Sequence, residues 1–253
     1  MSKGVRFTFS LIQGLVTMAL SFVVIVTLIA SQDGHLVLEA RAHLWPALIH
    51  IWITFLVSLL LATRYRANLG SEAELLPVLF LTIVLANIKI LPLHQAITGT
   101  FLLDGGVLTF IYHGSLLYTS FLFLIGSLLF LRLSPSRIGF ITFVGAAGSA
   151  LLALLVPSSP NDPSFLLEAG VSDSLFLSIC ITLTVVAALS YLVIALGEHT
   201  KRDTRFKTVA FLLLTVGNAF VSISQRTFYN IIGLIIYGAG ATILVLVSRS
   251  YHI

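Results

Sequence analysis

Residues 174–196 read SLFLSICITLTVVAALSYLVIAL, a run that contains no charged side chain. A helix of about 20 mainly apolar residues crosses the hydrocarbon core of a bilayer, so a run of this length predicts a transmembrane helix. The strands of a membrane barrel alternate polar and apolar residues, and this run does not alternate. The stretch therefore predicts an all-α membrane fold and excludes a barrel.

The same kind of run recurs along the whole chain. Of the 253 residues, 58% are hydrophobic and 9% are charged, whereas a soluble domain carries roughly 25% charged residues. Such a chain lacks the polar surface that a soluble fold presents to water. We therefore predict one polytopic helix bundle over residues 1–253, with eight transmembrane helices at 8–30, 45–63, 75–94, 107–131, 138–156, 174–196, 207–224 and 229–247.

Basic residues are concentrated in alternate gaps between these runs. Loops rich in lysine and arginine stay in the cytoplasm, so we expect both termini to be cytoplasmic and the protein to lie in the plasma (inner) membrane. The same rule explains the net charge of +4 without a nucleic-acid partner. Of the 14 basic residues, Arg41 and Arg226 lie on the opposite side, Lys89 lies within a span, and the other eleven are Lys3, Arg6, Arg64, Arg66, Arg132, Arg137, Lys201, Arg202, Arg205, Lys207 and Arg249.

Two segments allow a second interpretation. Lys3 and Arg6 before an apolar run resemble a signal peptide, and cleavage there would leave seven helices with an outside N-terminus. The charged segment 198–207 fits an ordinary cytoplasmic loop, and it also suits contact with anionic lipid or a partner membrane protein. No tail is long enough for an output domain, so signalling would need a partner chain.

Lys89 is the ionisable residue that stands out within a span. Such residues are costly in a membrane and indicate a functional site by default. In the predicted helix 75–94 it lies about five residues, or 7–8 Å, below the outer end. One hypothesis is a snorkelling anchor, and the other is a buried cation facing Asp104, Glu39 or an anionic ligand. Pro92 is predicted to break the helix just beyond Lys89.

Three histidines are predicted to lie in the same layer, with His43 just outside it. His50, His94 and His113 come from three successive spans near the outer leaflet. Interfacial histidines often only bind carbonyls and headgroups, but a converging set would form a site for a ligand or a proton. The sequence therefore offers Lys89, His50, His94 and His113 as candidate ligand-binding residues, with Asp104 as counter-ion.

Other chemistries remain open for this layer. His50 and His113 are candidates to hold a haem iron axially, which would make the protein a redox subunit. Another transition metal would need imidazoles supported by carboxylates, and a lysine cation beside it would repel it. Short loops also fit a structural assembly subunit of a larger complex.

Catalytic signatures are missing from the sequence. It contains no P-loop motif, no H-E-x-x-H and no G-x-S-x-G, and the lone Cys180 is expected to pack as a small apolar residue. We therefore expect a non-enzymatic binding, sensing or transport component whose ligand and cofactor stay undetermined. Asn87, Asn218 and Gln13 are predicted to make interhelical hydrogen bonds. Close backbone approach is predicted at Gly145, Gly148, Gly233, Gly238 and Gly240.

Overall fold

The computed structural model describes residues 3–30, 37–64, 72–130, 138–156, 174–197, 202–224 and 227–249. Within these ranges the regular secondary structure is helical, which confirms the predicted all-α class. The helices are α1 (Lys3–Ala30), α2 (Val37–Arg64), α3 (Glu72–Ala86), the 3₁₀ turn η2 (Asn87–Lys89), α4 (Ile90–Thr98), α5 (Gly105–Phe130), α6 (Ile138–Leu155), α8 (Ser174–Leu196), α9 (Arg202–Ile223) and α10 (Thr227–Arg249).

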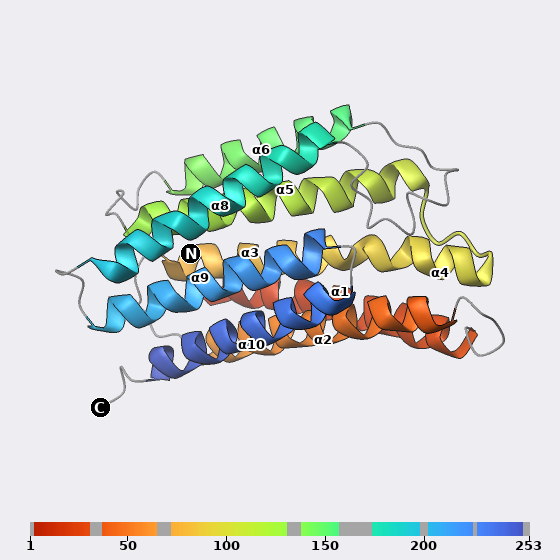
Figure 1. Cartoon of the computed structure of the whole chain (residues 1–253), viewed down its shortest axis with the longest axis horizontal. Helices are drawn as coiled ribbons and strands as arrows, with labels where there is room; N and C mark the ends of the chain where they lie inside the picture. The colour runs from red at the N-terminus through yellow and green to blue at the C-terminus, as the bar shows by residue number, and fades with distance from the viewer. Residues whose placement is uncertain are drawn as a thin grey trace.

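Eight segments among the described residues are long and apolar enough to cross a membrane, in agreement with the predicted number. One of them combines α3, η2 and α4 and extends to Thr98, four residues beyond the predicted boundary at 94. The helices lie side by side along the long axis of the molecule (Figure 1). Successive spans alternate in direction, so α1 begins and α10 ends at the same end of the bundle. We call this the terminal end and the opposite one the α4 end.

The span that contains α3, η2 and α4 is the most enclosed part of the bundle. In its apolar window 78% of the residues are buried, against 22% in α6 and in α8. The outer helices instead expose large apolar side chains such as Phe140 and Phe143 on α6 and Leu196 on α8. Lipid is the natural solvent for such surfaces. The polar residues of η2 are therefore held in the centre of the bundle rather than at its periphery.

The interruption of this central span falls at Asn87–Lys89. The sequence had predicted it just beyond Lys89, so the predicted position was wrong. Proline lacks the N–H that would bond the carbonyl four residues earlier, and its ring crowds that carbonyl. For Pro92 the affected carbonyl is that of Ile88, so the distortion lies on the N-terminal side of the proline. The helix then continues through Pro92 as α4.

Close packing of α9 against α10 rests on glycines. A Cβ placed on Gly217 would lie 2.7 Å from the Cα of Tyr237 and 2.8 Å from the carbonyl oxygen of Gly233. A Cβ on Gly240 would lie 2.8 Å from the carbonyl oxygen of Ala210. Small residues let membrane helices approach backbone to backbone in this way. The predicted close approach is thus confirmed at Gly233 and Gly240, whereas Gly148 faces open space.

We predict that Gly217→Ala destabilises the protein by about 1–3 kcal/mol, because the new methyl group meets backbone that cannot swing aside. Gly148→Ala is the matched control, since its methyl group meets nothing within 4 Å. Unfolding of the purified variants in detergent measures both effects. Equal stability of the two variants would contradict the packing described for α9 and α10.

Candidate functional site

His50 on α2 lies fully buried where α2 meets η2 and α10. Its Nδ1 is 3.3 Å from Nδ2 of Asn87, and its ring meets that of Tyr237 edge-on at a centroid distance of 4.5 Å. The hydroxyl of Tyr237 lies 2.9 Å from that of Thr54, which donates to the carbonyl of His50. Side chains from three parts of the chain therefore fix the orientation of this imidazole.

The hydrogen bonds of Asn87 assign the His50 tautomer. The Nδ2 atom of Asn87 donates to the carbonyl of Ile83 at 2.8 Å, which identifies it as the amide nitrogen. Its second hydrogen then points to Nδ1 of His50, which must accept. A neutral imidazole has one donor and one acceptor nitrogen, so Nε2 of His50 carries the proton. Among the described residues this buried Nε2 has no hydrogen-bond partner.

Lys89 binds the end of a helix rather than a carboxylate. Its Nζ donates to the carbonyl of Val221 at 2.7 Å and to that of Ser222 at 3.3 Å. These carbonyls belong to the last turn of α9, where no further helical N–H is available and the helix dipole places partial negative charge. The lysine ammonium therefore serves as the C-terminal cap of α9.

The end of α9 needs such a cap because it lies within the bundle. Figure 1 shows α9 and α10 meeting well short of the end at which α4 lies. Ser222 is 2% exposed, and its carbonyl also accepts a hydrogen bond from the hydroxyl of Tyr112 on α5 at 3.2 Å. An ammonium has three N–H groups, and two of those of Lys89 are bound by carbonyls of the described residues.

Lys89 is also placed deeper than the sequence suggested. The nine residues of α4 follow it, which correspond to about 13 Å of helix. Its side chain points to α9 and is only partly exposed. Of the two hypotheses for this residue, the geometry supports the inward-facing cation.

Asp104 has a local partner at the start of α5. Its Oδ1 accepts from the backbone N–H groups of Gly106 at 2.9 Å and Val107 at 3.3 Å, as an N-cap residue does. The side chain is exposed. The structure therefore places this carboxylate at a helix terminus and records no ion pair between it and Lys89 among the described residues. The side chains of Glu39 and His43 lie outside the described residues.

His94 on α4 joins a separate network of hydroxyl groups. Its Nδ1 is 2.8 Å from the hydroxyl of Thr27 on α1, and its Nε2 is 3.2 Å from that of Thr100. The hydroxyl of Thr27 already donates to the carbonyl of Val23, so it accepts from Nδ1–H. His94 thus ties α4 to α1.

His113 on α5 is directed toward another neighbour. Its Nδ1 donates to the carbonyl of Thr109 at 2.8 Å. Its ring lies edge-on to Phe176 of α8 at a centroid distance of 4.8 Å and to Tyr112 at 5.2 Å. The three histidines therefore face different helix interfaces. The structure brings His50 to Asn87 of η2, the turn that also carries Lys89, and we call these three residues the polar layer.

Several partners of the polar layer were not foreseen. Thr54, Tyr237 and the carbonyls of Val221 and Ser222 carry no sequence signal, because apolar and hydroxyl residues at such positions are common in any span. Asn87 was expected to bond between helices, and it does. The bond printed for Asn218 lies within α9, where its Oδ1 accepts from Ser222, and the interhelical bond expected of it stays a prediction.

Haem ligation fits this geometry less well than ligand binding does. Axial ligation uses the lone pair of an imidazole nitrogen, and Nε2 of His50, the ring nitrogen that does not face Asn87, carries the proton in the tautomer that Asn87 assigns. For metals in general, no group of three or more His, Cys, Asp or Glu side chains comes together among the residues that the structure describes.

No protein-family model, curated protein or solved structure matched this chain. The fold and the polar layer define its class: it is a multi-pass membrane protein with a lysine, a histidine and an asparagine enclosed in its central span. What this group does is argued below from its geometry.

We predict that Lys89→Met destabilises the protein by about 2–3 kcal/mol, because hydrogen bonds to charged groups contribute more than neutral ones. Tyr112→Phe should cost about 1 kcal/mol, since it removes one neutral hydrogen bond to Ser222. The double variant should deviate from additivity, because both side chains share that carbonyl. Unfolding in detergent tests this, and a Lys89→Met protein as stable as the parent would refute the capping role.

Proposed function

We propose that the protein is a non-enzymatic binding or transport component of a membrane, and that the polar layer is its ligand site. The observation that carries this proposal is Nε2 of His50, which is buried with its proton and without an acceptor among the described residues. A buried donor left unpaired costs free energy, and a ligand that supplies an acceptor would recover it.

The chemistry of the layer selects the kind of ligand. His50 offers one N–H, and Lys89 offers the N–H that α9 leaves unused. Both groups are donors, and the lysine adds a positive charge. A small anion with acceptor oxygens complements them, and a carboxylate is the simplest such group because two oxygens can meet two donors.

Access to this site would involve α10. The ring of Tyr237 lies against His50, and its hydroxyl is tied to Thr54. Movement of that ring, or of α10 as a whole, would uncover Nε2. An alternation between covered and uncovered arrangements is the kind of two-state change that transport requires. With the basic loops in the cytoplasm, the α4 end would face outward.

We predict that small carboxylates stabilise the purified protein against heat. Acetate, propionate and lactate are the probes, with chloride as the comparator. A ligand at 100 times its Kd adds about 2.7 kcal/mol to the stability of the folded state, which raises the Tm. His50→Phe should abolish this rise, because phenylalanine fills the space without donating a hydrogen bond.

Tyr118→Phe serves as the matched control. It removes a hydroxyl that donates to the carbonyl of Thr142 between α5 and α6, away from the polar layer, so its Tm should still rise with carboxylate. If no carboxylate stabilises the parent protein, or if His50→Phe responds as the parent does, the proposed site is wrong.

A further inference from the structure

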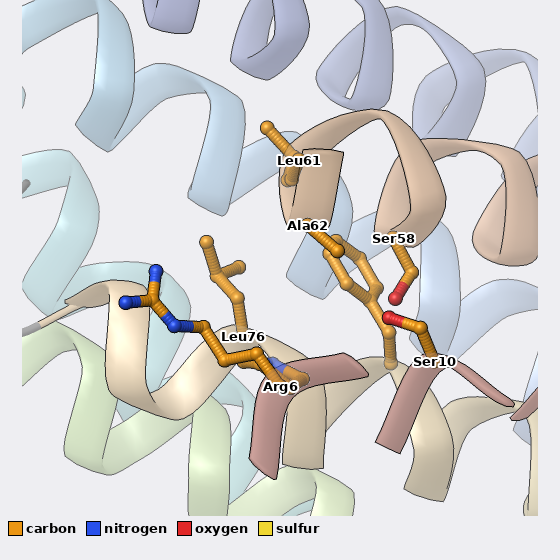
Figure 2. Close-up of a pocket in the computed structure, with 8 residues that line it drawn as sticks. Arg6, Ser10, Ser58, Leu61, Ala62 and Leu76 are labelled. Atoms are coloured by element: carbon orange, nitrogen blue, oxygen red, sulfur yellow. The ribbon is translucent and has the colours of Figure 1, made fainter. Parts of the chain in front are cut away.

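A pocket opens at the terminal end of the bundle, where α1, α2 and α3 meet. Its volume is about 20 Å³, and a single water molecule needs about 10–15 Å³ measured in this way. Figure 2 shows the hydroxyls of Ser10 and Ser58 directed toward each other from α1 and α2, with Arg6 extending on the other side. The pocket thus combines room for water with polar groups that bind it.

A stripe of unpaired polar atoms leads away from this pocket along α1. Ser10, Gln13 and Thr17 share one face of the helix, because they are spaced by three and four residues. They are 5%, 0% and 0% exposed. The two hydroxyls and both amide atoms of Gln13 have no hydrogen-bond partner among the described residues. The interhelical bond predicted for Gln13 is therefore not made.

Other hydroxyls of α1 behave differently. Thr8, Ser21 and Thr27 each donate to the carbonyl four residues earlier, at distances of 2.6–3.0 Å. This is the usual way for a helical serine or threonine to satisfy its hydroxyl without a neighbour. Ser10 and Thr17 do not use it. In α1 the unpaired hydroxyls are therefore those of Ser10 and Thr17, whereas Ser21, one turn beyond Thr17 on the same face, is satisfied within the helix.

Polar residues of α2 lie at the same levels. His50, Thr54 and Ser58 are spaced by four residues, and all are buried. Ser58 lines the pocket that it shares with Ser10, whereas His50 and Thr54 contact Tyr237 on α10. Gly14 sets the register of the two antiparallel helices, because a Cβ there would lie 3.1 Å from the ring of Phe55. Ser10 is then level with Ser58, as their shared pocket shows, and Thr17 is level with the region of His50.

We propose that a file of water molecules enters at this pocket and follows the polar face of α1 to the level of His50. Four polar atoms without partners on one stripe are costly in a membrane protein, where no lipid can satisfy them. Buried water binds two to four such groups at once. The file gives the middle of the bundle a hydrated connection to the terminal end, along which protons can pass. It rests on the geometry of α1 and α2 and does not require the carboxylate site.

Cysteine accessibility tests the water file in the full chain, reconstituted in lipid nanodiscs. The native Cys180 is first replaced by alanine, and single cysteines are introduced as Ser10→Cys, Gln13→Cys and Thr17→Cys. Ag⁺ is the probe because it is small, charged and bound by thiolates. After exposure to Ag⁺ the protein is denatured, and the thiols that remain are counted with a maleimide.

The matched controls are Leu11→Cys, Leu15→Cys and Met18→Cys, which lie on the exposed face of α1 at neighbouring levels. Thiolates form in water and not in hydrocarbon, so we expect the inward cysteines to be blocked at least about tenfold faster than the controls. Ser10→Cys changes a single atom and keeps the test valid if Gln13→Cys fails to fold. Equal or slower blocking of the inward cysteines would overturn the proposal.

Discussion

The end of α9 imposes the constraint on which the centre of this molecule depends. A helix that ends inside a bundle leaves its last carbonyls without N–H partners, and in a membrane no solvent replaces them. Here the donors come from two other helices, as Lys89 and Tyr112 meet at the carbonyl of Ser222. A lysine within an apolar span is thereby explained, because its charge lies against the negative end of a helix dipole.

The polar layer follows from the same place in the chain. Lys89 and Asn87 occupy the 3₁₀ turn that precedes Pro92. That turn interrupts the regular helix in the most enclosed span, and its two polar side chains reach different neighbours: Lys89 reaches α9 and Asn87 reaches His50 on α2. His50 in turn contacts Tyr237 on α10, whose backbone packs directly against Gly217 of α9. The turn therefore couples α2, α9 and α10 at one level of the bundle.

Much of the fold could be predicted from the sequence, because the length of an apolar run determines whether it spans a bilayer. Lys89 could be singled out for its cost in such a run. The partners of Lys89 could not be predicted, because they depend on where α9 ends within the bundle. If α9 ended one turn further along, its terminal carbonyls would lie beyond the reach of Lys89. The boundary at Thr98 was also missed, because Gln95 ends the apolar run without ending the helix.

The convergence of the histidines was harder to predict for a geometric reason. Depth along the bundle can be counted from the sequence, but the direction of a side chain depends on the rotation of its helix. His94 and His113 share a layer with His50 in sequence terms, yet they face α1 and α8. Asp104 was expected opposite Lys89, but its place before the first turn of α5 gives it backbone N–H partners of its own.

The ¹⁵N chemical shifts of the His50 ring, measured in selectively labelled protein in lipid nanodiscs, test the central claim most directly. We predict a protonated Nε2 and an unprotonated Nδ1 that accepts from Asn87, with Nε2 changing on addition of acetate. A proton on Nδ1 would contradict the hydrogen-bond network described here and, with it, the donor site at the polar layer.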